Sequence, residues 1–318
     1  MDWTKLGETI IKENDKINSK SSVDLYLSKV KKIAKDFGAA DNKNLKFLDD
    51  TEKVMKTFED KSISTQKNYL WSIYTILKYG GGDEKLIEKY LGLFNKVADK
   101  VQEEKNNGLK SKKQEENWVE LTELHKILKT HEKQYKLGIK GDKISNEGMK
   151  HLRMFLAGNL YIGDPENPPR RLQDYAKMHI VSKKEYDTLT DKEKSTENYL
   201  IQNKNKKQFS FGNYKTDAKY GTMKIDVGKK LSSVINRYLK YHKGKFLLET
   251  RTGKHLTSLE LGSLLNEVFR RSGKKISVSM LRHIFISENF GEVAKKQKET
   301  ASKMGHSVGT AINEYAVE

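Results

Sequence analysis

Residues 277–287 read SVSMLRHIFIS, a stretch in which Arg282 and His283 interrupt an otherwise apolar segment. The flanking Leu281 and Ile284 recur at helical spacing, so we expect a helix with one face in a protein core. A guanidinium beside such a core requires an acidic partner or an anionic ligand, because an unpaired charge there is costly. A lone histidine in this setting is more typical of a hydrogen-bonded core residue. The segment therefore predicts a helix on a core, with an anion-binding arginine at its edge.

A second pair of arginines lies upstream in PPRRLQDYAKM, residues 168–178. Arg171 and Asp174 are three residues apart, a spacing at which an ion pair on a helix can orient the guanidinium. This register favours Arg171 over the neighbouring Arg170. A planar, permanently charged fork suits phosphate recognition, although Arg–Asp pairs on helices are most often surface ion pairs.

Strand-like segments lie between these two stretches, at NYLIQ (198–202), KQFSFGNYK (207–215) and YGTMKIDV (220–227). The residues TDAK join the last two segments, so we expect a β-hairpin. Lys215 lies in this hairpin, where a lysine can reach a phosphate or a leaving oxygen. Lys219 is its rival, and either can equally be one of many surface lysines.

The rest of the chain is expected to be helical. Helical periodicity predicts helices over residues 21–38, 63–79, 83–102, 120–137 and 144–160, and again from Leu231 onward. A polar run, EEKNNGLKSKKQEEN (103–117), has the composition of an exposed linker. We therefore predict a mainly α fold with a small β-sheet or hairpin (α+β). It would contain a helical bundle over residues 1–110, a linker over 111–117 and a second domain over 118–318.

Net charge separates the two parts of the chain. The whole sequence carries +18, of which residues 1–116 contribute +3 (23 Lys against 20 acids) and residues 117–318 contribute +15 (38 Lys and Arg against 23 acids). The window 201–250 alone has 12 basic and 3 acidic residues. A polyanionic partner such as double-stranded DNA explains this excess, because neutralised phosphates release counterions. A generally lysine-rich composition is the alternative.

Several classes of function are disfavoured by composition. The chain has no cysteine, which excludes disulfide and thiolate-metal chemistry. No apolar run is long enough to span a membrane, and the N-terminus lacks the layout of a signal peptide. We expect an intracellular, non-secreted protein located at DNA, in a nucleus, a cytoplasmic viral factory or a virion.

The chain ends KMGHSVGTAINEYAVE (303–318), with Tyr315 nine residues after His306. In order, the sequence therefore contains Arg171-x-x-Asp, a hairpin lysine, Leu-Arg282-His283 and a Gly-His pair whose histidine is followed by Tyr at the ninth position. This order and spacing resemble the tyrosine recombinase, or phage-integrase, family over residues 118–318, and the N-terminal bundle is similar to that family's core-binding domain. The arginine box and hairpin resemble integrases of large DNA viruses and virophages.

The resemblance implies a DNA strand exchange through a 3′-phosphotyrosyl intermediate, without a metal or other cofactor. The implied roles are Tyr315 as nucleophile, Arg171 and Arg282 as phosphate ligands, and Lys215 as general acid. His306 would donate a hydrogen bond to a non-bridging oxygen, and His283 would brace the pocket or help in proton transfer. The family also implies a homo-tetramer on two synapsed DNA sites.

Two departures from the family pattern are visible. Ser279 occupies the place, three residues before Arg282, where the family often has His or Lys, and three residues follow Tyr315. A type IB topoisomerase, a telomere resolvase and a catalytically inactive DNA-binding protein of the same fold are the alternative functions. For DNA contacts we predict Gln66 and Lys67 on the polar face of the 63–79 helix. In the basic window we predict Lys219 and Lys224.

Overall fold

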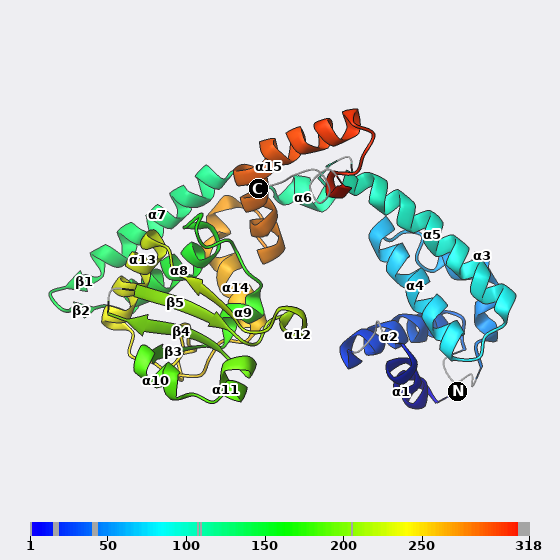
Figure 1. Ribbon diagram of the computed structural model, residues 1–318, viewed down its shortest axis with the longest axis horizontal. Coiled ribbons are helices and arrows are strands. Elements are labelled where there is room, and N and C mark those ends of the chain that lie inside the picture. The colour runs from blue at the N-terminus through cyan, green and yellow to red at the C-terminus, as the bar shows by residue number, and fades with distance from the viewer. Residues whose placement is uncertain are drawn as a thin grey trace. The chain divides into compact units, whose positions relative to one another are not determined.

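The computed structural model describes residues 2–14, 19–39, 44–106, 108, 110–204 and 206–310. The chain divides into two compact units, Met1–Lys110 and Ser111–Glu318. Each is mainly helical, and the second also contains two small sheets, so the predicted α+β fold class is confirmed (Figure 1). Within the described ranges, no helix is both long and apolar enough to cross a membrane.

The first unit is a helical bundle. Its elements are α1 (Trp3–Glu13), α2 (Lys20–Asp36), the 3-10 helix η1 (Lys46–Leu48), α3 (Thr51–Lys56), α4 (Ile63–Tyr79) and α5 (Glu84–Asn106). Apolar residues of these helices form one core, in which Ile10, Val30, Leu48 and Ile73 are fully buried. Tyr90 is buried with them and donates its hydroxyl to the Leu48 carbonyl oxygen at 2.8 Å, so its polar group is satisfied inside the core.

The helices of the second unit surround a larger core. They are α6 (Lys112–Asn117), α7 (Leu121–Leu137), α8 (Asn146–Ile162), α9 (Leu172–Ala176), α10 (Lys183–Thr188), α11 (Asp191–Thr196), α12 (Asp217–Tyr220), α13 (Lys229–Tyr241), α14 (Ser258–Val268) and α15 (Val278–Lys303), with the 3-10 helix η2 (Arg270–Ser272). Strands β1 (Ile139–Lys140) and β2 (Lys143–Ile144) join α7 to α8 as a short hairpin. At that junction a Cβ on Gly138 would come within 2.6 Å of the Gly148 Cα, so the two helices approach as closely as glycine permits.

A four-stranded sheet carries the predicted hairpin. Its order is β3–β4–β5–β6, formed by β3 (Met178–Ser182), β4 (Asn198–Asn203), β5 (Lys206–Phe211) and β6 (Met223–Asp226). The β3–β4 pair is parallel and the other two pairs are antiparallel. Side chains alternate along β4: Leu200 joins the main core, whereas Tyr199 and Ile201 form a small second cluster with Tyr186 of α10. Both faces of the sheet are therefore covered.

The structure differs from the sequence-based expectation at three elements near this sheet. Strand β3 and helices α10 and α11 were not predicted. The hairpin of β5 and β6 is present, but β5 ends earlier than expected, at Phe211, and β6 begins later, at Met223. Lys215 consequently lies in the connection between the strands, which contains α12 and turns at Gly221, a residue with φ +65°.

Candidate active site

A cavity of about 590 Å³ in the second unit brings the two predicted arginine segments together. One wall is formed by the segment from Pro168 to Asp174, and another by the first turns of α15. The connection between β5 and β6 supplies a third wall through Tyr214, Thr216 and Tyr220. The predicted residues Arg171, Arg282 and His283 all line this cavity.

The α15 wall follows from helical spacing. Val278, Leu281, Ile284 and other apolar residues are buried, and Ser277 caps the helix by accepting a hydrogen bond from the Met280 amide at 3.2 Å. The opposite face presents Ser279, Arg282, His283 and Ile286, at positions i, i+3, i+4 and i+7, to the cavity. Arg282 is exposed but follows the buried Leu281, so it lies at the edge of the core as predicted. His283 is also exposed, so the interpretation of His283 as a core histidine is wrong.

The expected pairing at the start of α9 is wrong in one respect. Asp174 accepts a hydrogen bond from the Nε of Arg170, not Arg171, at 2.8 Å. Arg171 is the residue before the first turn of α9, where it is half-buried and lines the cavity. The i,i+4 register therefore decides the ion pair. The Arg171 side chain takes no part in that pair and faces the cavity.

Asp174 is an unusual carboxylate because only 2% of its side chain is exposed. Burial raises the pKa of Asp174, and the adjacent Arg170 opposes that shift. Its Oδ1 atom has no hydrogen-bond partner within the described part of the chain. The ion pair with Arg170 therefore compensates only one of the two buried carboxylate oxygens.

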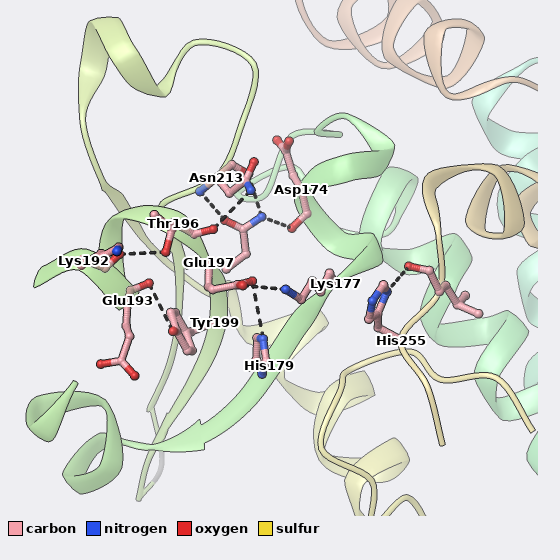
Figure 2. Close-up of polar contacts among 12 residues, drawn as sticks. Asp174, Lys177, His179, Lys192, Glu193, Thr196, Glu197, Tyr199, Asn213 and His255 are labelled. Atoms are coloured by element: carbon pink, nitrogen blue, oxygen red, sulfur yellow. Dashed lines mark hydrogen bonds and ion pairs between the residues drawn. The ribbon is translucent and has the colours of Figure 1, made fainter. Parts of the chain in front are cut away.

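An asparagine pair holds α9 against the connection between β5 and β6 (Figure 2). Asn198 is buried at the start of β4, and its Nδ2 donates to the carbonyl oxygens of Asp174, at 3.1 Å, and Asn213, at 2.8 Å. In return the Asn213 amide donates to Asn198 Oδ1 at 2.9 Å. These residues carry no recognisable signal in the sequence, since partners so far apart in the chain leave no local pattern.

A second polar cluster lies beside these residues, around a cavity of about 210 Å³ (Figure 2). Glu197 contacts Lys177 at 2.5 Å and the His179 Nε2 at 3.6 Å. Burial lowers the pKa of His179, and Glu197 opposes this effect. The Glu197 carboxylate is therefore paired with Lys177 and His179 of the same cluster.

Lys215 and His306 are not among the residues that line the main cavity. Lys215 is exposed between two residues that line it, Tyr214 and Thr216, but does not line it itself. His306 follows the last turn of α15, where its amide donates to the Ala301 carbonyl oxygen at 2.9 Å. The structure therefore does not bring His306 together with Arg282. Tyr315 lies outside the described residues.

The predicted DNA contacts have other interactions in the structure. Lys219 lies over the Tyr220 ring at 4.9 Å. Lys224 lies over Tyr186 at 4.9 Å, on the opposite face of β6 from the cavity. In the first unit, the Lys67 Nζ lies 5.6 Å from the Phe94 ring centre.

Gln66 has a structural role that the sequence did not indicate. Its Nε2 donates to the carbonyl oxygens of Glu59 and Lys61, both at 2.9 Å. These bonds hold the turn before α4. Reading a base edge with the same nitrogen would require breaking them.

Among the described residues, no group of three or more histidine and carboxylate side chains is arranged to hold a metal ion. Three arginines line the main cavity together with the His283 imidazole. Arg170 is paired with Asp174, so the fixed cations available to a ligand there are Arg171 and Arg282. Such an arrangement suits a phosphate ester, whose charge increases in the transition state.

Comparisons with known proteins find only distant structural similarity. No protein-family model matches it, and no curated protein matches it. A crystal structure of XerA recombinase is 10% identical, with a TM-score of 0.35, and covers 99% of this chain and 93% of that chain. A structure of the Tn1549 transposon integrase in complex with circular intermediate DNA is 15% identical, with a TM-score of 0.47, and covers 100% of this chain and 96% of that one. At these values the likeness is too distant to assign a function.

Proposed function

We propose that the chain is a site-specific DNA recombinase of the tyrosine recombinase type, which integrates or excises a mobile or viral element. The observation that carries this proposal is the shared cavity of Arg171 and Arg282, which come from segments far apart in the sequence. Together with the net charge of +18, it supports a site for a phosphodiester of DNA.

In the proposed reaction Arg171 and Arg282 bind the non-bridging oxygens of the scissile phosphate and stabilise their growing charge. The hydroxyl oxygen of Tyr315 attacks phosphorus, so that an O–P bond forms as the bond to the 5′-oxygen breaks. A second 5′-hydroxyl then attacks the phosphotyrosine and releases the tyrosine. The bond energy is kept throughout, and the exchange needs no cofactor.

Two proton transfers accompany the first displacement. Lys215 donates a proton to the departing 5′-oxygen. His283 accepts the proton of Tyr315, because it is the imidazole at the cavity and Ser279, one helical turn away, is a poor base near neutral pH. His306 donates a hydrogen bond to a non-bridging oxygen once it reaches the site.

The acting form is proposed to be a homo-tetramer on two synapsed double-stranded DNA sites, inside the cell. Lysines of the basic window 201–250 would contact phosphates, which adds affinity without sequence information. The first unit would bind the same duplex and supply further contacts through α4.

A suicide-substrate assay tests the proposal. Nicked duplexes from the ends of the host element are mixed with the protein without metal, and covalent adducts are separated on a denaturing gel. We expect an adduct with the wild-type chain and none with Tyr315→Phe. Binding without an adduct would favour an inactive DNA-binding protein. Relaxation of supercoiled DNA without exchange between two sites would favour a topoisomerase, and closure of DNA ends into hairpins would favour a telomere resolvase.

A further inference from the structure

Arg170 connects the arginine segment to the strands that carry the Lys215 connection. Its Nε donates to Asp174 Oδ2 at 2.8 Å, while its Nη1 donates to the Met223 sulfur at 3.5 Å. The guanidinium carbon lies 3.9 Å from the centre of the Phe211 ring and 5.3 Å from that of Tyr214. One side chain thus contacts α9, the end of β5 and the start of β6.

These contacts lie at the base of the connection. Phe211 and Met223 are opposite each other in the last pair of the β5–β6 ladder, immediately before and after the residues that include Lys215. Tyr214 closes the connection further along, because its hydroxyl donates to the Gly221 carbonyl oxygen at 2.8 Å. Arg170 therefore holds the point from which the connection extends.

Stabilisation of the fold is not sufficient to explain the buried ion pair of Arg170 and Asp174. Its side chain is 17% exposed and that of Asp174 is 2% exposed, so both charges have lost most of their hydration. Buried ion pairs of this kind are often no more stable than apolar residues of the same shape. The specific gain is geometric, since a planar guanidinium that pairs with a carboxylate and stacks on an aromatic ring has one allowed orientation.

We infer that Arg170 is a positioning residue for Lys215: it fixes the base of the β5–β6 connection relative to the phosphate-binding Arg171, its neighbour in the chain. This inference rests on the proposed function. General acid catalysis requires the donor to come within hydrogen-bond reach of the leaving oxygen. Loss of Arg170 therefore slows leaving-group protonation, whereas phosphate binding by Arg171 and Arg282 persists.

A change of leaving group isolates this step. In a nicked duplex whose scissile 5′-oxygen is replaced by sulfur, the tyrosine oxygen forms the same bond to phosphorus and the P–S bond breaks. The departing thiolate is far less basic than an alkoxide and needs no proton, because thiols have pKa values near 8.5 whereas alcohols ionise only in strong base. A defect in general acid catalysis then disappears, but a defect in folding or phosphate binding remains.

The experiment compares initial rates of adduct formation on oxygen and sulfur substrates for the wild-type chain, Lys215→Ala, Arg170→Met and Arg171→Ala. Arg170→Met keeps an apolar stem against Phe211. General acids contribute roughly 10²–10⁴-fold, so we expect Lys215→Ala to lose that factor on oxygen and Arg170→Met to lose about 10²-fold. Both are expected to return to within a few-fold of wild type on sulfur. Arg171→Ala should be slow on both substrates.

Several outcomes overturn the inference. If Arg170→Met is equally slow on both substrates, Arg170 does not position the acid. The same conclusion follows if Arg170→Met is as fast as wild type on the oxygen substrate. If the sulfur substrate does not restore the rate of Lys215→Ala, Lys215 is not the general acid, and Arg170 then has no acid to position. If Arg170→Met does not fold, Arg170→Lys, which keeps the charge but not the planar fork, is subject to the same criteria. A wild-type chain that forms no adduct on either substrate contradicts the proposed function itself, which separates that failure from the others.

Discussion

Arg282 and His306 lie at opposite ends of one helix, separated by roughly 30 Å along α15 at 1.5 Å per residue. Arg282 faces the main cavity from the first turns, whereas His306 follows the last turn. Between them, residues 286–300 include no buried side chain, so packing does little to hold this half of the helix straight. For His306 to reach a phosphate bound by Arg282 of the same chain, α15 has to bend.

We expect that bend at Gly291, and Gly291→Ala should oppose it. A Cβ at this position would meet no atom within 4 Å, and alanine stabilises a helix interior by about 0.5–1 kcal/mol over glycine. Amide exchange protection over residues 287–303 should therefore rise about two- to fivefold. Adduct formation should fall by the same factor, because the bent state becomes less populated.

Gly92→Ala in α5 is the matched control, since a Cβ there also meets no atom within 4 Å. It should leave adduct formation unchanged. Greater protection in Gly291→Ala with an unchanged rate would show that no bend within one chain is needed. His306 would then be supplied by a second copy.

Replacing Asp174 should be far more damaging to stability than replacing Arg171. Asp174→Ala leaves the buried Arg170 guanidinium without its partner, which costs on the order of 3–5 kcal/mol. Arg171→Ala removes a half-buried side chain that takes no part in this ion pair and should change the free energy of unfolding by less than about 0.5 kcal/mol. Adduct formation should nevertheless be lost in Arg171→Ala.

Urea unfolding followed by tryptophan fluorescence measures this difference. A background of Trp3→Phe and Trp71→Phe leaves Trp118 as the reporter of the second unit. Equal stability losses in the two variants would contradict the assignment of the ion pair to Arg170.

Much of the fold could be predicted because its signals are local. Amphipathic spacing located α2, α4, α7 and α8, and the β5–β6 hairpin followed from alternation and turn residues. Strand β3 could not be predicted because its parallel neighbour, β4, follows two short helices, and parallel pairing leaves no turn signal. The helices α10 and α11 are shorter than the window in which periodicity becomes visible.

The cavity was predictable in part for the same reason. The i, i+3, i+4 pattern of Ser279, Arg282 and His283 is a property of one helix. By contrast, the choice between Arg170 and Arg171 depends on Phe211 and Met223, whose positions come from tertiary structure. Both arginines have an allowed helical spacing to the acidic residue, so local reasoning could not separate them.

Gln66 and Lys67 are adjacent on α4 and should respond differently to substitution. Gln66→Ala removes two hydrogen bonds to the backbone before α4 and should lower the stability of the first unit by about 1–2 kcal/mol. Lys67→Ala should leave stability nearly unchanged. If Lys67 contacts a phosphate, its loss lowers the slope of log affinity against log salt by about 1.

Fluorescence-anisotropy titrations of a labelled duplex at several salt concentrations give that slope. Gln66→Ala should keep the wild-type slope, measured where the protein is folded. A Lys67→Ala slope equal to that of wild type would remove this residue from the DNA interface.

The stability of the second unit should fall in mild acid because of His131. Its Nε2 donates to the Val268 carbonyl oxygen at 3.0 Å, and its Nδ1 lies 2.9 Å from the Nδ1 of His151. Burial lowers the pKa of His131 below the ordinary 6.5; the hydrogen bond to Val268 and the charge of Glu267 oppose this shift, whereas His151 and Arg271 add to it. The unfolded chain therefore takes up a proton at higher pH than the folded one. The contribution of His131 to stability is therefore complete above about pH 6.5 and is lost as the pH falls from there through the lower pKa of the folded protein.

His131→Gln should weaken this dependence, because glutamine does not titrate and its amide can still donate to Val268. The measurement is the urea midpoint at pH 7.5, 6.5 and 5.5, with Trp118 as reporter. Part of the decline should persist, since burial also lowers the pKa of His179 in the same unit. Thr130→Ala on the same helix should behave like wild type. A full wild-type decline in His131→Gln would mean that another group causes the acid sensitivity.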